Sequence, residues 1–165
     1  MVPPADLDKW ALNQGFPDLV NVAAKQTSQF DEYYNCIAHA FLDDQNWWWP
    51  TGLPAGGHDQ HGCYWPMASD NRTCMQAFTD WFAKDGWTQS SSDSFDPNKQ
   101  KIALYADFNN SPTHAARQLG HRIWTSKLGK GLDLSHDLRE LTGPTYGRVI
   151  TFFEKAASMN PTPSA

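Results

Sequence analysis

The sequence has little of three features that would assign it quickly to a familiar class. Basic residues are in the minority, since 13 Lys and Arg stand against 18 Asp and Glu, for a net charge of -5. Nucleic-acid affinity rests largely on phosphate neutralisation, so we expect no nucleic-acid partner. No apolar run approaches the ~18 residues of a membrane helix, and residues 1–4 lack the basic and apolar regions of a signal peptide. We expect no membrane contact, and a location in the cytoplasm or export without a classical signal.

Cysteine is also scarce, and its count is odd. Three cysteines cannot form a complete disulfide framework, so at least one thiol is free, although a bridge between Cys63 and Cys74 stays open. With 165 residues the chain is long enough for one domain with a real core. We predict a single domain over 1–157, a flexible tail over 158–165 and a monomer.

Long aliphatic runs are missing as well, and eight Trp and nine Phe carry much of the apolar content. The densest points are Trp47 to Pro50 and Tyr64 to Pro66. Aromatic clusters of this kind fill a core or line a groove that binds a substrate chain, and core packing is the commoner outcome. In the groove interpretation, Trp49 and Trp65 are substrate-binding candidates.

Hydrophobic periodicity predicts helices first and strands later. Residues 71–84 carry Met75, Phe78 and Phe82 on one helical face before a stop at Gly86. A second helix is predicted from Cys36 to about Asp44, and residues 5–30 read as short helical pieces and turns packed on the outside. A long loop over 45–70 and a polar linker over 89–99 separate these elements.

Alternation then predicts a meander of three antiparallel strands over 101–107, 113–119 and 122–128. A short helix starting at Ser135 and presenting Leu134, Leu138 and Leu141 on one face follows, with a final strand over 146–155. The expected fold class is α+β, with helices on one face of a small antiparallel sheet.

Cys36 is the leading candidate nucleophile. Asn35 is a good helix N-cap, which places Cys36 in the first helical turn. Unpaired N–H groups and the helix dipole favour the thiolate there, and the thiolate is the form that attacks carbonyl carbon. A buried, unreactive thiol is the alternative from this stretch alone.

A thiol nucleophile needs a base, and six histidines are available. His114 is preferred because small residues flank it on the middle predicted strand, whereas His39 reads as a packing residue on the Cys36 helix. A rival site is zinc at His58, His61, Cys63 and Cys74, which form a chemically complete ligand set at irregular spacing. We favour no metal and no cofactor.

Five motifs add a resemblance that spans about residues 30–155. They are YNCIAHA from Tyr34, WWWP from Trp47, YWP from Tyr64, THAARQL from Thr113 and WTSKLG from Trp124. Together they resemble a small, poorly characterised family of microbial proteins. That family in turn is similar to papain-like thiol hydrolases, including NlpC-type cell-wall peptidases, and to bacterial effector toxins that deamidate Rho GTPases.

The resemblance implies a papain-like fold with Cys36 as nucleophile and His114 as base. Asp137 is the preferred third catalytic residue, with Asp107 and Ser126 as alternatives. The Cys36 N–H and a side chain of Tyr34, Asn35 or Gln118 would bind the oxyanion.

The predicted function is therefore hydrolysis of an amide in a protein or peptide, by a deamidase or a peptidase. The alternative is a non-catalytic interaction module that binds a partner through its Trp-rich loop.

Overall fold

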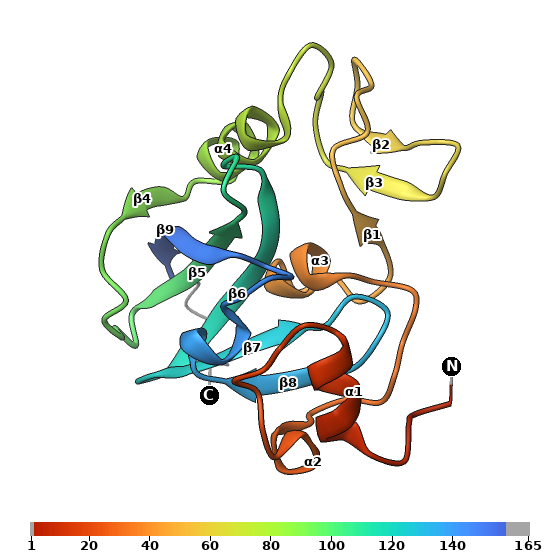
Figure 1. Cartoon of the computed structure of the whole chain (residues 1–165). Coiled ribbons are helices and arrows are strands. Elements are labelled where there is room, and N and C mark those ends of the chain that lie inside the picture. Colours follow the sequence, from red (N-terminus) through yellow and green to blue (C-terminus); the bar gives the residue numbers. More distant parts are fainter. Residues whose placement is uncertain (1, 158–165) are drawn as a thin grey trace, which may run out of the picture.

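The computed structural model describes residues 2–157, which form a mixed α+β fold with few helices and two sheets (Figure 1). The helices are α1 (Leu7–Asn13), α2 (Val22–Lys25), α3 (Cys36–Ala40), α4 (Cys74–Lys84) and the 3-10 helix η1 (Leu138–Leu141). The small sheet contains β1 (Trp47–Trp48), β2 (Gly57–His58) and β3 (Cys63–Trp65). The large sheet contains β4 (Thr88–Ser90), β5 (Lys99–Ala106), β6 (Pro112–Gly120), β7 (Ile123–Lys127), β8 (Asp133–His136) and β9 (Arg148–Ala156). The predicted tail over 158–165 lies outside the described residues.

The predicted three-strand meander is confirmed as β5, β6 and β7 within the large sheet. The sheet has the order β4-β9-β5-β6-β7-β8, and its neighbouring pairs are antiparallel. The predicted final strand is β9, which pairs with β5 on one side and β4 on the other. The last strand of the described residues therefore lies inside the sheet, and its side chains can contribute to both faces.

The amphipathic helix over 71–84 is confirmed as α4, which begins three residues later than predicted. Thr73 caps it in a reciprocal arrangement with Gln76, and this capping box fixes the start. Phe78 and Phe82 are buried on its inner face. Gly86, with φ of 85°, follows the end of the helix, as the sequence predicts.

Two predicted helices are wrong in extent or place. The helix from Cys36 ends at Ala40 rather than Asp44, because Leu42 adopts a left-handed conformation with φ of 63° that an α-helix cannot continue through. Ser135 does not start a helix either. It lies in β8 opposite Thr125, and the helical turn η1 is capped by Asp137 instead. Leucines that are spaced for a helix are thus divided between a strand and a 3-10 turn.

Two segments predicted as irregular contain short strands. The loop over 45–70 carries β1, β2 and β3, and the linker over 89–99 begins within β4. Strands of two or three residues leave too little alternation to be recognised in a sequence. Their tertiary pairing, such as Trp48 with Tyr64, holds them in place.

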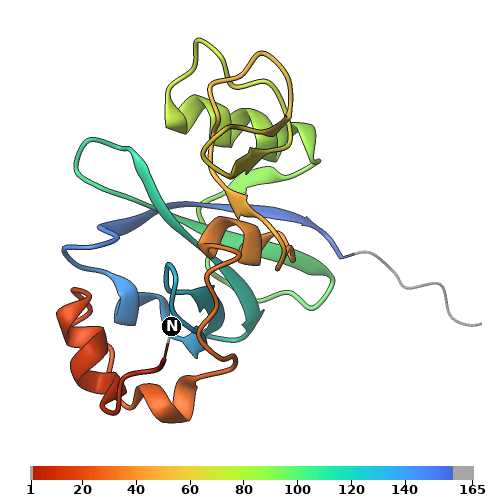
Figure 2. The ribbon, with the colours of Figure 1, turned by 90° about the vertical axis from the view of Figure 1, so that its right-hand side faces the viewer.

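The large sheet separates two hydrophobic clusters. In Figure 2, α4 lies on one side of this sheet, and α1 and α2 lie on the other. The first cluster joins α3, α4 and the small sheet to one side of the large sheet, and its buried aromatic residues include Trp48, Trp65, Phe78 and Phe82. The second joins α1, α2 and η1 to the other side, around Phe16, Tyr105, Trp124 and Tyr146. The prediction of an aromatic-rich core is confirmed. The segment over 5–30 packs against the sheet, with Ala11, Phe16 and Val22 buried.

Candidate functional site

Cys36 begins α3 at the point where β6 and β7 separate. The two strands pair between Arg117 and Gly120 of β6, and α3 contacts both. The backbone N–H groups of Ala115, Ile37 and Cys36 act on the thiol to lower its pKa. Ala115 is the residue after His114, the histidine that the sequence predicts as base.

His114 lies on the side of β6 that faces away from α3, where two polar side chains and a backbone carbonyl form a hydrogen-bonded series from it. Its Nε2 lies 2.8 Å from the Ser126 hydroxyl, and the same hydroxyl lies 2.7 Å from Nε2 of His136. The Nδ1 atom of His136 lies 2.8 Å from the backbone carbonyl of Asp137. The Nδ1 atom of His114 is buried without a hydrogen-bond partner. An unused imidazole nitrogen in a protein interior is costly, so this atom calls for an explanation.

The environment favours the neutral forms of these groups. Burial raises the pKa of the Cys36 thiol to about 11, although the three N–H groups and Lys127 oppose the shift. Burial lowers the pKa of His114 well below its usual range, and the neighbouring His136 and His39 lower it further. Burial also lowers the pKa of His136 to about 4. The expected thiolate is therefore not the resting form in this closed arrangement, because desolvation outweighs the helix terminus.

A second histidine network lies on the α3 side of β7. His39 Nε2 lies 2.9 Å from the Thr125 hydroxyl, and His39 Nδ1 lies 3.5 Å from a carboxylate oxygen of Asp133. The Tyr34 hydroxyl donates to the same carboxylate oxygen at 2.8 Å. The Lys127 ammonium lies 4.8 Å from the centre of the Tyr34 ring. This network fastens α3 to the sheet, in keeping with the packing role expected for His39.

Both candidate catalytic side chains are covered. Cys36 is 6% exposed and His114 has no exposed area. The Tyr146 ring stacks on His114 with centroids 3.9 Å apart, and Phe16 of the N-terminal segment packs on Tyr146 at 4.9 Å. Gly147, with φ of 74°, lets the chain pass close to the Ala106 carbonyl where a Cβ would collide. A reaction at Cys36 requires movement of this cover.

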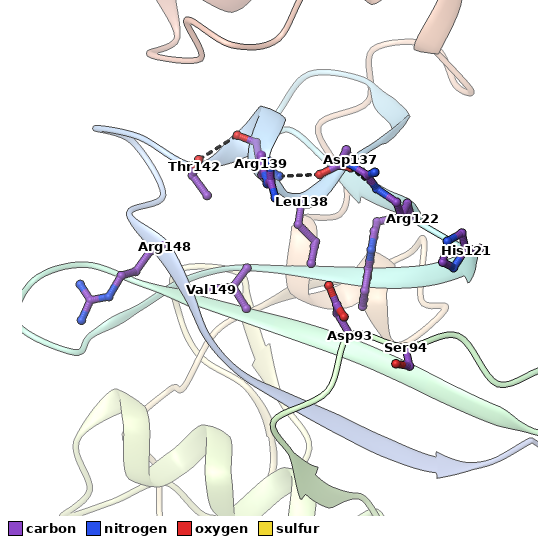
Figure 3. A pocket seen from close by; sticks show the side chains of 11 residues that line it. Asp93, Ser94, His121, Arg122, Asp137, Leu138, Arg139, Thr142, Arg148 and Val149 are labelled. Carbon is purple, nitrogen blue, oxygen red and sulfur yellow. Dashed lines mark hydrogen bonds and ion pairs between the residues drawn. The ribbon is translucent and has the colours of Figure 1, made fainter.

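Asp137 does not lie against His114. Its carboxylate accepts from the Arg139 N–H at 3.0 Å and pairs with the Arg122 guanidinium at 3.0 Å, on the wall of a surface cavity (Figure 3). These hydrogen bonds outweigh burial and lower the pKa of the carboxyl. Asp107 also lies elsewhere, since it accepts from Asn109 and Ser111 in the β5–β6 turn. Of the three proposed third residues, the structure brings only Ser126 to His114.

The proposed oxyanion side chains are occupied by other contacts. The Asn35 amide caps α3 through Ala38 and bonds to the backbone of Trp48. Tyr34 donates to Asp133, and Gln118 donates to the Asp93 carbonyl at 2.8 Å. Of the predicted donors, the backbone N–H of Cys36 is the one that remains beside the sulfur.

The tryptophan candidates divide between core and surface. Trp65 has no exposed area and packs on Phe78 at 5.0 Å, so it belongs to the core. Trp49 is partly buried and also meets Phe78, edge to face at 5.6 Å.

The rival zinc residues do not converge. Within residues 2–157, no three His, Cys, Asp or Glu side chains cluster closely enough to hold a metal ion. His58 instead bonds to Asn46 at 2.8 Å, and Cys63 and Cys74 are free thiols rather than a disulfide.

His136 and Tyr146 are the site residues that sequence reasoning missed. The sequence did not point to His136 as a site residue, because its segment is predicted as part of a helix that starts at Ser135. Had Asp133 to His136 been recognised as a strand beside β7, alternation would have placed Leu134 and His136 on one face with Ser126. Tyr146 comes from a loop, where no periodic signal exists.

Comparisons with known proteins assign the chain to a family whose description names no function. Within the described residues, no helix has the length and apolar character needed to cross a membrane. Neither a curated protein nor a solved structure is significantly similar to the chain. A family model described as Domain of unknown function (DUF7689) matches residues 25–154. This match covers most of the chain, including the elements that carry Cys36, His114 and His136, and the protein therefore belongs to the DUF7689 family.

Proposed function

We propose that the protein is a thiol-dependent hydrolase of amide bonds, with Cys36 as nucleophile and His114 as general base. The observation that carries the proposal is the unpartnered Nδ1 of His114, whose following residue, Ala115, has a backbone N–H that lowers the pKa of the Cys36 thiol. Its other nitrogen is held by Ser126, as a base requires for a fixed orientation. The substrate is a carboxamide side chain or a peptide bond of a protein or peptide.

The reaction begins from a neutral pair. No hydrogen bond joins Nδ1 of His114 to Cys36 in the resting arrangement, so the proposed reaction requires the two side chains to come within hydrogen-bond reach when the cover moves. As the sulfur attacks the carbonyl carbon, the thiol proton then moves to Nδ1 of His114, and the backbone N–H of Cys36 stabilises the developing oxyanion. The C–N bond then breaks, and His114 returns the proton to the departing ammonia or amine. Water attacks the resulting thioester with His114 again as base, which releases the carboxylic acid and restores the thiol. Proton transfer from Cys36 to His114 during the attack is suited to this pair, because the pKa values of the thiol and the imidazole both favour the neutral forms.

Entry of the substrate requires Tyr146 to move. A cavity of about 350 Å³ is lined by Tyr146 together with Trp10, Phe16 and Leu128. It is large enough for an amide-bearing side chain. Rotation of the Tyr146 ring away from His114 would extend this cavity toward the Cys36–His114 pair.

A papain-like arrangement belongs to the same proposal. Its support is the order of the parts: a cysteine at the start of a helix, a histidine on a following strand and a hydroxyl on the next strand of an antiparallel sheet. The preferred Asp137 is replaced in this proposal by Ser126, because the contacts of Asp137 lie with Arg122 and Arg139.

The non-catalytic interaction module remains the second candidate. Burial of Cys36 and the raised pKa of its thiol favour it, because both describe an unreactive core cysteine. In that case the partly exposed Trp47 and Trp49 of the Trp-rich loop would contact a partner.

Product analysis with glutamine-containing peptides tests the proposal. The wild-type chain is incubated with the peptides, and released ammonia and new N-termini are measured separately, which also distinguishes a deamidase from a peptidase. We expect Cys36→Ala to abolish both products, whereas Cys63→Ala, which removes a thiol outside the site, keeps wild-type activity. Because Cys36→Ala deletes one sulfur atom, its thermal unfolding should stay close to wild type. Turnover that persists in Cys36→Ala would refute the hydrolase and favour the interaction module.

A further inference from the structure

The hydrogen bonds that link His114, Ser126, His136 and the Asp137 carbonyl determine which ring nitrogen of each histidine carries a proton. A neutral imidazole has one N–H donor and one acceptor nitrogen, and a serine hydroxyl has a single proton. A backbone carbonyl can only accept. The four groups are linked by contacts of 2.7 to 2.8 Å, so each contact must contain one donor and one acceptor.

The assignment starts at the Asp137 carbonyl. Since this oxygen accepts, Nδ1 of His136 carries the proton, and the neutral ring then has an acceptor at Nε2. That acceptor takes the hydroxyl proton of Ser126. With its only proton used, the Ser126 oxygen must accept from His114, so Nε2 of His114 carries a proton.

We propose that His136, acting through Ser126, is a positioning residue that holds His114 in the tautomer protonated at Nε2, so that the lone pair of Nδ1 is free to take the Cys36 proton. This inference rests on the proposed function for its purpose, although the tautomer itself is a property of the resting protein. It gives a reason for the unpartnered Nδ1 atom, which is the nitrogen that a base needs to keep vacant.

The opposite tautomer is disfavoured by two contacts. A proton on Nδ1 of His114 would be a buried donor without an acceptor. The lone pair left on Nε2 would then face the Ser126 oxygen, whose proton points to His136. Burial supports the assignment further, because it keeps both rings neutral through a pKa of about 4 for His136 and a lowered pKa for His114.

Asp137 acquires a different role from the one its sequence position indicates. Its backbone carbonyl, rather than its carboxylate, anchors the chain. Any residue at this position would supply the carbonyl. The donor and acceptor order of the four linked groups therefore depends on the backbone position where β8 ends and η1 begins.

Nitrogen-15 NMR of the histidine rings tests the assignment in the full-length protein. Long-range spectra at pH 7.5 distinguish protonated from unprotonated ring nitrogens. We expect His114 to be protonated at Nε2 and His136 at Nδ1. In His136→Phe the Ser126 hydroxyl loses its acceptor and can donate to Nε2 of His114, so we expect a larger fraction of His114 protonated at Nδ1 than in the wild type, limited by the cost of the unpartnered Nδ1 proton. Protonation at Nδ1 of His114 in the wild type, or an unchanged tautomer in His136→Phe, would overturn the inference.

Kinetics with the glutamine-containing peptides supply a second readout. Ser126→Ala should lower kcat by about tenfold or more with little change in KM, since it disturbs a base rather than a binding surface. Ser126→Thr keeps a hydroxyl and should recover most of the rate. Thr125→Val, which removes the neighbouring hydroxyl on the other side of β7, is the matched control. Equal losses in Ser126→Ala and Ser126→Thr would contradict the hydroxyl relay.

The two proposals fail in different ways. If the predicted tautomers are observed but Cys36→Ala keeps full activity, the positioning of His114 stands and the hydrolase fails. If Cys36→Ala abolishes activity while His114 is protonated at Nδ1, the hydrolase stands and the role of His136 fails.

Discussion

Adjacent residues of β7 hold two histidines on opposite sides of the sheet. Thr125 bonds to His39 on the α3 side, and Ser126 bonds to His114 on the other side. His39 has a carboxylate beside it, partial exposure and a neighbour at each ring nitrogen. His114 has no exposed area and keeps Nδ1 unpartnered. A carboxylate next to a histidine therefore marks the structural anchor here, while the vacant nitrogen marks the candidate base.

Removal of each imidazole in turn tests this comparison most strongly. We expect His114→Ala to lower turnover of the glutamine-containing peptides about 1000-fold, in the range of general-base loss. His39→Ala should lower it less than about tenfold, because His39 acts through the placement of α3. Circular dichroism of both variants provides the control for folding. A larger loss in His39→Ala would move the catalytic pair into α3.

The pH dependence of stability should come from the buried histidines His136 and His114. His136 has a pKa of about 4 when folded, with Asp137, Glu140 and Lys25 as its charged neighbours. The unfolded chain, with a usual value near ~6.5, binds this proton more readily between these pH values, so stability is present above pH ~6.5 and is lost as pH falls toward 4. The expected loss from His136 is about 3 kcal/mol, and His114 adds to it with the same sign.

Urea denaturation across this pH range measures the effect. His136→Phe should flatten the dependence relative to wild type, whereas His121→Gln, in the exposed β6–β7 turn, should leave it unchanged. A wild-type stability that stays constant from pH 7 to pH 4 would be inconsistent with a neutral, buried His136.

The carboxylate on the α3 side should matter for stability rather than for catalysis. Asp133→Asn removes the charge that faces His39 and Lys127 and weakens the bond from Tyr34. We expect a loss of about 2 kcal/mol in the free energy of unfolding, typical of a buried hydrogen bond to a charged group. Turnover should stay within about twofold of wild type. A turnover loss comparable to that of His114→Ala would show that the anchor is also catalytic.

The smallest effect is expected at the residue that sequence reasoning preferred. Asp137→Asn breaks a surface pair with Arg122, whose side chain is 68% exposed, and weakens the cap of η1. Such interactions contribute about 1 kcal/mol or less, and turnover should be unchanged. Arg122→Ala removes the same ion pair from the other side and is the matched control. A hundredfold drop in turnover for Asp137→Asn alone would restore it as the third catalytic residue.

Several elements could be predicted because their signals are local. The apolar stripe and cap of α4, the alternation of β5 to β7 and the N-cap before Cys36 all lie within a few residues. The segment from Asp133 to Leu141 could not, because its leucines fit a helix equally well and only pairing with β7 selects a strand. That error concealed His136 and left Asp137 as the apparent partner of His114.

The sequence by itself determined that Cys36 starts a helix and that His114 lies within a strand, because caps and alternation act over neighbouring residues. Only the tertiary structure decided the partners of His114. Ser126 and His136 reach it from neighbouring strands, and Tyr146 covers it from a loop. It also decided the protonation of the pair, since the pKa of a thiol or imidazole depends on desolvation by residues far away in the chain.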